Sequence, residues 1–335
     1  MSEYKNLKGF NLQSLSSDPS SPFLGQTWFN STSGSLKAYI NQAAAGVWTA
    51  GGAMATARAG QAGAGTNTAT LSFGGSTFIP PFSAPRVTCT ESYNGSTWTA
   101  GGALGTARTV AGAGTNTAAL AFGGSGAGGA TIACTESYNG STWSAGGAMG
   151  TARSYLAGAG TNTAALGFGG YAGAVIRACT ESYNGSTWTA GGALGTARTG
   201  LAGAGASNTA ALAFGGRIGV PSVMGACTES YNGSTWSAGG ALGTARSYLA
   251  GAGASNTAAL AFGGSTTAIV ACTESYNGSA WTAGSALITC RSSLTGAGTN
   301  TAALAFGGST TVRVACTESY NVGGPTTCTR TITTS

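Results

Sequence analysis

The stretch Cys179-Thr-Glu-Ser-Tyr-Asn-Gly-Ser-Thr-Trp-Thr-Ala190 decides the fold. It places two strand-like runs, Cys-Thr-Glu-Ser-Tyr and Thr-Trp-Thr-Ala, on either side of an Asn-Gly pair. Asn-Gly between two such runs is the strongest short signal for a β-hairpin, because a type I′ turn needs a positive φ at both central residues. We therefore expect two antiparallel strands joined by a type I′ turn at Asn184 and Gly185.

This hairpin belongs to a larger unit that occurs six times. Each copy has an arginine, a Phe-Gly-Gly segment, a Cys-Thr-Glu-Ser-Tyr run and, in most copies, a tryptophan. The Trp-to-Arg spacing is ten residues in all six copies. The aromatic markers are Phe73, Phe122, Phe168, Phe214, Phe262 and Phe306, Tyr93, Tyr138, Tyr183, Tyr231, Tyr276 and Tyr320, and Trp48, Trp98, Trp143, Trp188, Trp236 and Trp281. Such regularity indicates one repeated supersecondary unit.

Each copy has room for four short strands. After the arginine come a run of small residues, a Thr-Asn or Ser-Asn turn, an apolar run ending in Gly-Gly, and then the hairpin. The Phe-Gly-Gly segments recur every 44 to 49 residues, a length typical of a four-stranded antiparallel propeller blade. The sequence therefore predicts an all-β fold, a six-bladed β-propeller of four-stranded antiparallel blades.

The order arginine, apolar strand, Gly-Gly, variable loop, Glu-x-Tyr, turn and tryptophan resembles the kelch repeat over residues 48–320. The resemblance implies a kelch-like propeller. The last copy has no tryptophan after Tyr320, whereas Trp48 has no Cys-Thr-Glu-Ser-Tyr run before it. We expect residues 47–50 to supply the outer strand of the last blade, which would close the ring, remove exposed sheet edges and place Trp48 beside Tyr320.

The N-terminal residues differ from the repeat. Gly25-Gln-Thr-Trp-Phe-Asn30 and Ser35-Leu-Lys-Ala-Tyr-Ile40 indicate a β-hairpin. Together with Tyr4-Lys-Asn-Leu-Lys-Gly9 and Ser16-Ser-Asp-Pro19, this stretch resembles the N-terminus of structural and tail-associated proteins of tailed bacteriophages. We divide the chain into an extended docking segment (1–24), a hairpin (25–46), the propeller (47–321) and a C-terminal strand or tail (322–335).

The residues offer little catalytic chemistry. The chain has no histidine, the commonest general base and metal ligand. Kelch-like copper oxidases need histidine ligands, so that site cannot be built here. One glutamate per copy at equivalent ring positions does not converge with the others, as a glycosidase's carboxylate pair must. We expect no enzymatic activity, no catalytic residue, no metal site and no cofactor.

The repeat glutamates and arginines have a structural explanation. A buried charge is tolerated only when it is paired and hydrogen-bonded, so we expect one ion pair per copy. The predicted pairs join the glutamates Glu91, Glu136, Glu181, Glu229, Glu274 and Glu318 to the arginines Arg58, Arg108, Arg153, Arg198, Arg246 and Arg291.

The cysteines predict no metal or disulfide framework. The six repeat cysteines (Cys89, Cys134, Cys179, Cys227, Cys272 and Cys316) show no C-x-x-C spacing, and we expect them to fill the core in reduced form. Cys290 and Cys328 lie outside the pattern, and the sequence leaves open whether they pair.

The charge and hydropathy of the chain limit the classes of partner that we expect. The net charge of +6 arises from 14 Lys and Arg against 8 Asp and Glu, which favours an anionic partner such as nucleic acid or an acidic glycan. Without a basic run, nucleic acid is disfavoured. The first 25 residues lack the apolar core of a secretory signal, and no stretch has the ~18 apolar residues of a membrane span. We expect no membrane insertion and synthesis in a host cytoplasm.

Differences between the copies gather in two places. The loop between Gly-Gly and Cys has 13, 9, 8, 10, 7 and 7 residues in successive copies, and the residues after each repeat arginine vary as well. In an up-down blade the Gly-Gly–Cys loop and the segment after the repeat arginine emerge on the same side. We therefore expect them to form one variable face. Drift of unconstrained surface loops is the alternative explanation. The candidate binding residues on this face are Phe78, Ile79, Phe82, Arg86, Tyr155, Tyr171, Arg177, Arg217, Tyr248 and Arg313.

Aromatic and arginine side chains on loops are typical of binding hot spots. With the phage resemblance, they predict a virion protein, a tail-associated fibre or adhesin, whose variable face binds a host-surface glycan or protein. Its N-terminal segment would dock to other virion proteins. The alternative is a purely structural or decoration protein whose propeller packs against other virion subunits. The ligand, the position in the virion, and the copy number, including a homo-oligomer, stay open.

Overall fold

The computed structural model describes residues 12–42, 46–77, 85–219, 221, 223–323 and 326–332. Its described residues form strands, turns and a single 3-10 turn, η2 (Ala127–Gly129). The chain divides into two compact units, residues 46–321, called here the repeat unit, and residues 1–45 with 322–335, called the terminal unit.

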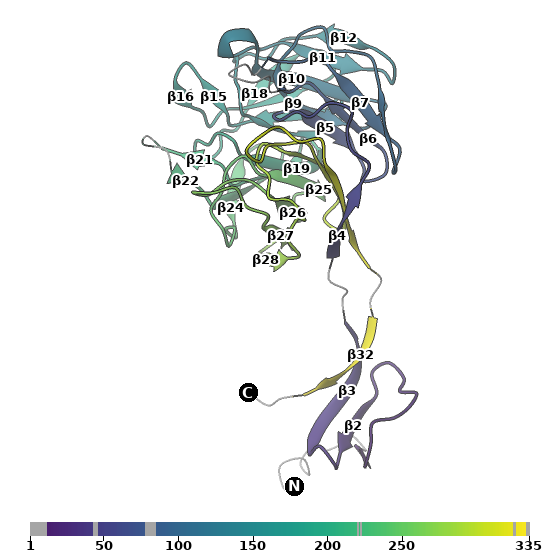
Figure 1. The fold of residues 1–335 in the computed structure, drawn as a ribbon. Helices are drawn as coiled ribbons and strands as arrows, with labels where there is room; N and C mark the ends of the chain where they lie inside the picture. Colours follow the sequence, from purple (N-terminus) through teal and green to yellow (C-terminus); the bar gives the residue numbers. More distant parts are fainter. Residues whose placement is uncertain are drawn as a thin grey trace. The chain divides into compact units, whose positions relative to one another are not determined.

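The repeat unit consists of repeated four-stranded sheets, as in a β-propeller (Figure 1). Their neighbouring strands run antiparallel in the pairs with described registers. We number them repeat sheets 1 to 6 in chain order.

The bounds of the strands are as follows. Sheet 1 contains β5 (Ala62–Gly65), β6 (Thr70–Phe73), β7 (Thr90–Tyr93) and β8 (Trp98–Ala100). Sheet 2 contains β9 (Thr109–Gly114), β10 (Ala119–Ser125), β11 (Thr135–Tyr138) and β12 (Trp143–Gly146). Sheet 3 contains β13 (Ala157–Gly160), β14 (Ala165–Phe168), β17 (Thr180–Tyr183) and β18 (Trp188–Gly191).

Sheet 4 contains β19 (Ala202–Ser207), β20 (Ala210–Phe214), β23 (Thr228–Tyr231) and β24 (Trp236–Gly239). Sheet 5 contains β25 (Ala250–Ser255), β26 (Ala258–Phe262), β27 (Thr273–Tyr276) and β28 (Trp281–Gly284). Sheet 6 contains β29 (Thr295–Gly298), β30 (Ala302–Phe306), β31 (Thr317–Val322) and β4 (Gly46–Gly51). Two small two-stranded sheets pair β15 (Tyr171–Ala172) with β16 (Val175–Ile176), and β21 (Arg217–Ile218) with β22 (Val223–Met224).

The hairpin predicted around Asn184 and Gly185 is present, but its turn differs from the expected type I′. Tyr183 pairs with Trp188 across β17 and β18. Gly185 has a φ of +96°, whereas Asn184 has no left-handed φ. The Asn184 side chain instead accepts hydrogen bonds from the backbone N–H groups of Ser186 and Thr187, at 3.0 and 2.9 Å. Asparagine therefore fixes the turn from its first position through its side chain.

Neighbouring repeat sheets pack through a tryptophan and a phenylalanine. Phe168 of sheet 3 is fully buried, and the Trp236 ring of sheet 4 lies 4.9 Å from it. Trp236 also donates a hydrogen bond to Thr180 at 2.9 Å. A Cβ on Gly203 would lie 2.8 Å from the Phe168 ring, so glycine is needed for β19 to approach sheet 3 this closely. The equivalent ring pairs are Trp143–Phe73, Trp188–Phe122, Trp281–Phe214, Trp48–Phe262 and Trp98–Phe306.

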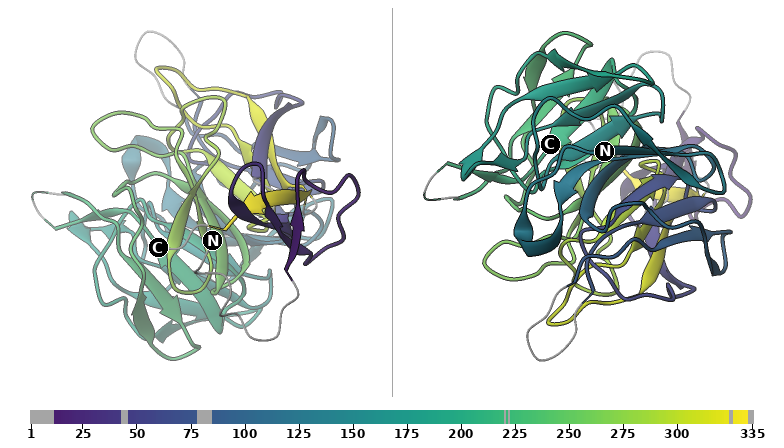
Figure 2. Two further views of the ribbon diagram at one scale, coloured as in Figure 1. Left: turned by 90° about the horizontal axis from the view of Figure 1, so that it is seen from below. Right: turned by 90° about the horizontal axis from the view of Figure 1, so that it is seen from above.

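The first strand of the repeat unit lies in the same sheet as the strands of the last repeat. β4 lies next to β31 in sheet 6, and the Trp48 ring lies 5.0 Å from that of Tyr320, as the complementary gaps in the repeat predicted. The innermost strands contact one another in the order β5, β9, β13, β19, β25 and β29, and β29 also contacts β5. Figure 2 views these sheets from below and from above.

The terminal unit holds a four-stranded sheet in the order β1, β2, β3 and β32. The predicted hairpin corresponds to β2 (Thr27–Asn30) and β3 (Ser35–Gln42). The structure extends it on both sides. β1 (Gln13–Leu15), from the predicted docking segment, runs parallel to β2, and β32 (Thr326–Thr331), from the predicted tail, runs antiparallel to β3.

Asp18 organises the polar side of this sheet. Its carboxylate accepts hydrogen bonds from Lys37 at 2.8 Å, Asn30 at 2.7 Å and Trp28 at 3.1 Å. These donors, Lys37 first, lower the pKa of Asp18 from 3.8 to about 2. Trp28 itself is fully buried. Asp18 therefore links the strand-forming segments through a charge-assisted cluster.

We predict that Asp18→Asn weakens the terminal sheet at neutral pH. Because the folded-state pKa lies below the unfolded value, the carboxylate contributes stability that is present above pH ~4 and lost as pH falls through ~2. The Trp28 indole N–H resonance of the variant should exchange faster with solvent than that of the wild type. This difference should shrink as the pH is lowered to about 2. Equal exchange rates at neutral pH would contradict the prediction.

Candidate functional site

The structure brings the two variable segments of each repeat together. The residue after each repeat arginine pairs with the residue after Gly-Gly in all six repeats. The pairs are Ala59–Ser76, Thr109–Ser125, Ser154–Tyr171, Thr199–Arg217, Ser247–Ser265 and Ser292–Ser309. We call the surface formed by these segments and the Gly-Gly–Cys loops the variable-loop face.

The inner strands of the six repeat sheets line a central space, called here the channel. A chain of backbone hydrogen bonds lies beside it at this face. It connects the second residue after each repeat arginine, and we call these residues the mouth ring. The bonds run from Val110 N to Gly60 O (3.2 Å), Gly60 N to Ser293 O (3.0 Å), Ser293 N to Tyr248 O (2.8 Å), Tyr248 N to Gly200 O (2.7 Å) and Gly200 N to Tyr155 O (2.9 Å). Five bonds thus connect six repeats through their own backbones.

Three mouth-ring residues hold strained backbones. Gly60 and Gly200 have left-handed φ values of +65° and +61°, which glycine adopts freely. Tyr155, Tyr248 and Ser293 have φ values of 53°, 52° and 52°, at a cost of about 1–3 kcal/mol each. A bulky residue in this region is a genuine outlier, and such outliers cluster at ligand sites.

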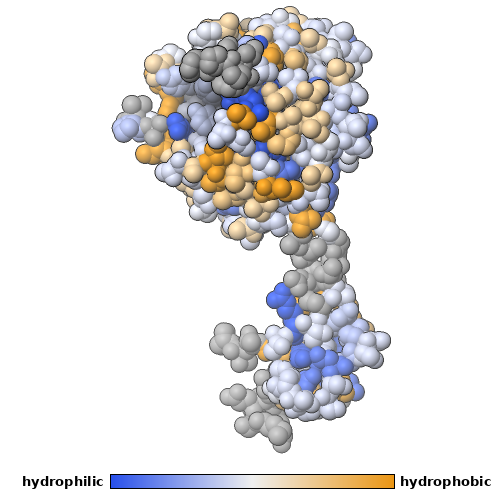
Figure 3. Space-filling model, in the orientation of Figure 1, coloured by the Kyte–Doolittle hydropathy of each residue, from blue (hydrophilic) through white to orange (hydrophobic). Residues whose placement is uncertain are grey.

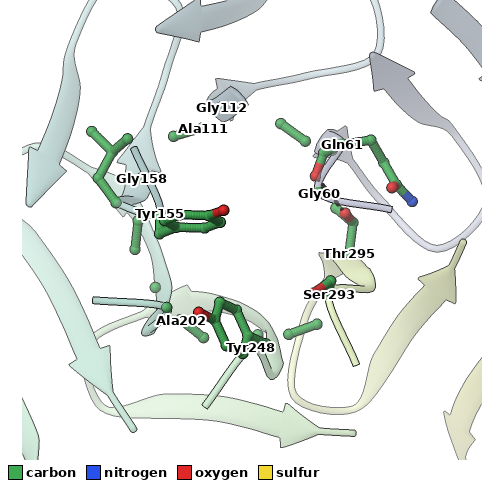
Figure 4. Close-up of a pocket in the computed structure, with 18 of the residues that line it drawn as sticks. Gly60, Gln61, Ala111, Gly112, Tyr155, Gly158, Ala202, Tyr248, Ser293 and Thr295 are labelled. Carbon is green, nitrogen blue, oxygen red and sulfur yellow. Dashed lines mark hydrogen bonds between the residues drawn. The ribbon is translucent and has the colours of Figure 1, made fainter. Parts of the chain in front are cut away.

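Both strained tyrosines project into the channel mouth (Figure 4). Their rings lie 5.8 Å apart in an edge-to-face arrangement. Burial raises the pKa of Tyr248, and the guanidinium group of Arg217, 5.6 Å from its ring centroid, opposes this shift. Tyr155 remains 46% exposed. One wall of the mouth is therefore aromatic and accessible to solvent.

Three cavities lie along the channel. One of about 210 Å³ contains the two tyrosines and the inner-strand glycines and alanines. Another, of about 270 Å³, lies among the distal halves of the inner strands. The third, of about 170 Å³, we call the mouth pocket. Its lining comprises Ala59, Gly60, Ser76, Arg86, Thr109, Tyr155, Tyr248, Ser293 and Arg313.

The six buried ion pairs use all the glutamates of the repeat unit. Five pairs have N···O distances of 2.8 to 3.1 Å, and Arg108 pairs with Glu136 in the same way. The six arginines are fully buried. Burial lowers the pKa of Arg198, and the carboxylate of Glu229 opposes that shift. The structure thus brings together each glutamate and arginine that the sequence analysis paired.

Each ion pair also holds the connection between two sheets. Arg153 donates to the carbonyl oxygens of Gly169 and Cys179 at 2.9 and 2.7 Å, and to Glu181 at 2.8 Å. Glu181 in turn accepts a hydrogen bond from the backbone N–H of Gly150 at 2.6 Å. The pair therefore fixes the segment between β12 and β13 to the third strand of sheet 3.

The repeat cysteines contribute backbone atoms to this arrangement. In five repeats the arginine donates a hydrogen bond to the cysteine carbonyl oxygen. All six side chains are half-buried, so the expectation that they fill the core is wrong. Cys290 is exposed, and the side chain of Cys328 lies outside the described set.

Four arginines of the repeat unit are left without a carboxylate. The unit contains ten arginines and six glutamates, and within its described residues all six glutamates pair with repeat arginines. The remaining arginines are Arg86, Arg177, Arg217 and Arg313. All four lie in Gly-Gly–Cys loops, so the excess positive charge of the unit is confined to the variable-loop face.

The structure brings some of the predicted binding residues together but not others. Arg86, Tyr155, Tyr248 and Arg313 converge on the mouth pocket, and Arg217 lies against Tyr248. Two others, Tyr171 (exposed) and Arg177 (half-buried), line none of the three cavities. Phe78, Ile79 and Phe82 lie outside the described residues.

The sequence placed Gln61, Thr109 and Ser293 in the variable segments after the repeat arginines but did not single them out as binding residues. Gln61 donates a hydrogen bond to the carbonyl oxygen of Phe306 at 3.1 Å, joining sheet 1 to sheet 6. Ser293 belongs to the mouth ring, and Thr109 lines the mouth pocket. The available signal was their place one to three residues after a repeat arginine, where Gln61 replaces the leucine of four other repeats.

Comparisons with known proteins identify no family. No protein-family model matches this chain, and no curated protein sequence matches it significantly. Within the described ranges, His, Cys, Asp and Glu side chains form no group of three or more that could hold a metal ion. None of the described helical segments is long and apolar enough to cross a membrane.

We predict that Glu181→Gln lowers the free energy of unfolding by about 3 kcal/mol, because it leaves the Arg153 charge buried and unpaired. Chemical denaturation followed by tryptophan fluorescence measures the change. Ser186→Ala, an exposed turn residue, is the control and should alter stability by less than ~0.5 kcal/mol. Unchanged stability together with lost partner binding would instead indicate a functional carboxylate.

Proposed function

We propose that residues 46–321 form a closed, six-bladed, kelch-like β-propeller that serves as a binding module. Three contacts support closure between the first and last repeats: β29 against β5, Gly60 N to Ser293 O, and the Trp98 ring 5.1 Å from that of Phe306. Closure would bury the facing surfaces of sheets 1 and 6, which would otherwise be exposed to solvent.

The observation that carries the binding function is the composition of the variable-loop face. It holds the four arginines without carboxylate partners and two tyrosines in a strained backbone conformation. Arginine and tyrosine, together with tryptophan, are the residues enriched in binding hot spots. Strained residues persist only where the surrounding structure enforces them, which occurs mostly at functional sites.

The proposed function is non-catalytic. The chain has no histidine, and the described carboxylates of the repeat unit are all engaged by buried arginines. A general acid or base must be free to exchange a proton with substrate. Rigid loops that surround a channel mouth serve recognition without such a group.

The biological setting we propose is the virion of a tailed bacteriophage. Its support is the resemblance of the N-terminal residues to tail-associated phage proteins. The terminal unit would attach the chain to other virion proteins, and the variable-loop face would bind a host-surface glycan or protein.

A structural or decoration role in the virion is the second candidate. Three valines in the Gly-Gly–Cys loops, Val175, Val223 and Val312, are 49 to 55% exposed. Figure 3 shows further apolar side chains among polar ones on the visible surface of the repeat unit. Exposed apolar side chains around a binding surface also suit packing against another protein subunit.

The distinguishing experiment uses particles that carry variants of the full-length chain. Tyr171→Ala, Arg177→Ala and Arg217→Ala together should slow adsorption to host cells, since a hot-spot truncation costs about 2 kcal/mol or more in binding. The melting temperature should hardly move. Ser141→Ala, Ser186→Ala and Ser234→Ala, in exposed hairpin turns away from the variable loops, form the control. Normal adsorption by the first variant would reject host binding and favour the structural role.

A further inference from the structure

The mouth pocket has the charge pattern of an anion site. Arg86 and Arg313 both line it, and the other lining residues carry no acidic side chain. Arg86 comes from repeat 1 and donates to the carbonyl oxygen of Ser125 at 3.2 Å. Arg313 comes from repeat 6 and donates to the hydroxyl of Ser309 at 2.9 Å. Both guanidinium groups are thus held by neutral acceptors only, and both residues line one cavity.

The hydrogen-bonding capacity of Arg313 is not exhausted. The Nε of Arg313 is buried and has no hydrogen-bond partner among the described residues. Burial lowers the pKa of Arg313, and the neighbouring charge of Arg86 lowers it further. Two like charges in a half-buried pocket repel each other, and an oxyanion between them would replace this repulsion with charge-assisted hydrogen bonds.

The rest of the lining suits a polar ring better than a bare ion. Tyr155 and Tyr248 face the cavity with their rings edge to face, and Ser293 and Thr109 add hydroxyl groups beside them. An aromatic body with a polar tip provides both an apolar face and a hydrogen-bonding group. A sugar ring presents the matching surfaces, C–H groups on its faces and hydroxyl groups around its edge.

We infer that the mouth pocket binds an acidic sugar unit, with its carboxylate between Arg86 and Arg313 and its ring against Tyr155 and Tyr248. The inference deepens the proposed function, because it rests on the variable-loop face being the binding surface. Bidentate recognition of a planar carboxylate is the chemistry for which arginine is best shaped. The neutral lining hydroxyls then select the sugar that carries it.

The first test is titration of the full-length protein with sodium glucuronate at low ionic strength, where charge pairing is least screened. Wild type should bind it with a Kd in the millimolar range, about −4 kcal/mol. Arg86→Gln with Arg313→Gln should weaken binding about tenfold or more. Arg330→Gln is the matched control, since Arg330 is an exposed arginine of the terminal unit that does not line the pocket. Equal binding by wild type and the double variant, or none by wild type, would overturn the inference.

Two further ligands separate a sugar site from a simple anion site. Glucose lacks the carboxylate and should bind at least about tenfold more weakly than glucuronate. Sodium sulfate supplies an oxyanion without a ring and should compete only weakly. Sulfate binding as tightly as glucuronate would overturn the sugar assignment, and glucose binding as tightly would overturn the role of the arginines.

The second test uses the strain in the mouth ring. Tyr155→Gly and Tyr248→Gly replace each tyrosine with the residue found at Gly60 and Gly200, the equivalent positions in other repeats. Because glycine relieves the left-handed strain, the melting temperature should be maintained or raised while glucuronate binding is lost. Ala174→Gly relieves the same left-handed strain at an exposed residue that does not line the pocket, so it should stabilise the protein and leave binding within about twofold. Glucuronate binding retained by the tyrosine variants would overturn the inference.

Failure of the pocket and failure of the proposed function give different results. If the protein binds glucuronate through Arg86 and Arg313 but variant particles adsorb normally, host binding fails while the pocket stands. If adsorption depends on the variable-loop face but is not inhibited by glucuronate or changed by the Arg86 and Arg313 substitutions, the pocket fails while host binding stands.

Discussion

The buried arginine of each repeat is the interaction on which the rest of the structure depends. Arg153 and its five equivalents are fully excluded from solvent, where an unpaired charge would be prohibitively costly. The charge of each is neutralised by one glutamate. In most repeats the arginine also donates hydrogen bonds to carbonyl oxygens at the ends of two strands. The same glutamate binds the backbone that enters from the preceding sheet. One polar cluster therefore orders both the strands within a sheet and the step to the next.

This use of the glutamates determines the electrostatics of the outer surface. Once six carboxylates are committed to the interior, any additional arginine of the repeat unit lacks a partner nearby. All four additional arginines occur in the loops of one face. The charge that could attract an anionic partner is therefore concentrated on the variable-loop face, although the unit as a whole carries few charges.

Close packing of the inner strands shapes the same site from inside. Gly203 and its equivalents allow each inner strand to approach the phenylalanine of the preceding sheet. At one end of these strands lies the mouth ring, whose backbone groups form hydrogen bonds with one another. Five of the six mouth-ring residues have left-handed φ values, and Tyr155 and Tyr248 adopt them at a conformational cost. Recognition and strain thus occur at the same residues.

The sequence alone determined the repeated four-stranded units, their glutamate–arginine partners and the contact between Trp48 and Tyr320, because each depends on spacing that recurs in register. It predicted the hairpin but not its turn, since Asn184 acts through a side-chain hydrogen bond rather than a left-handed backbone. It also placed Arg86 and Arg313 on one face without indicating that they meet. Only the tertiary structure decided that, because residues 227 positions apart in the sequence line one pocket where the first and last repeats are in contact.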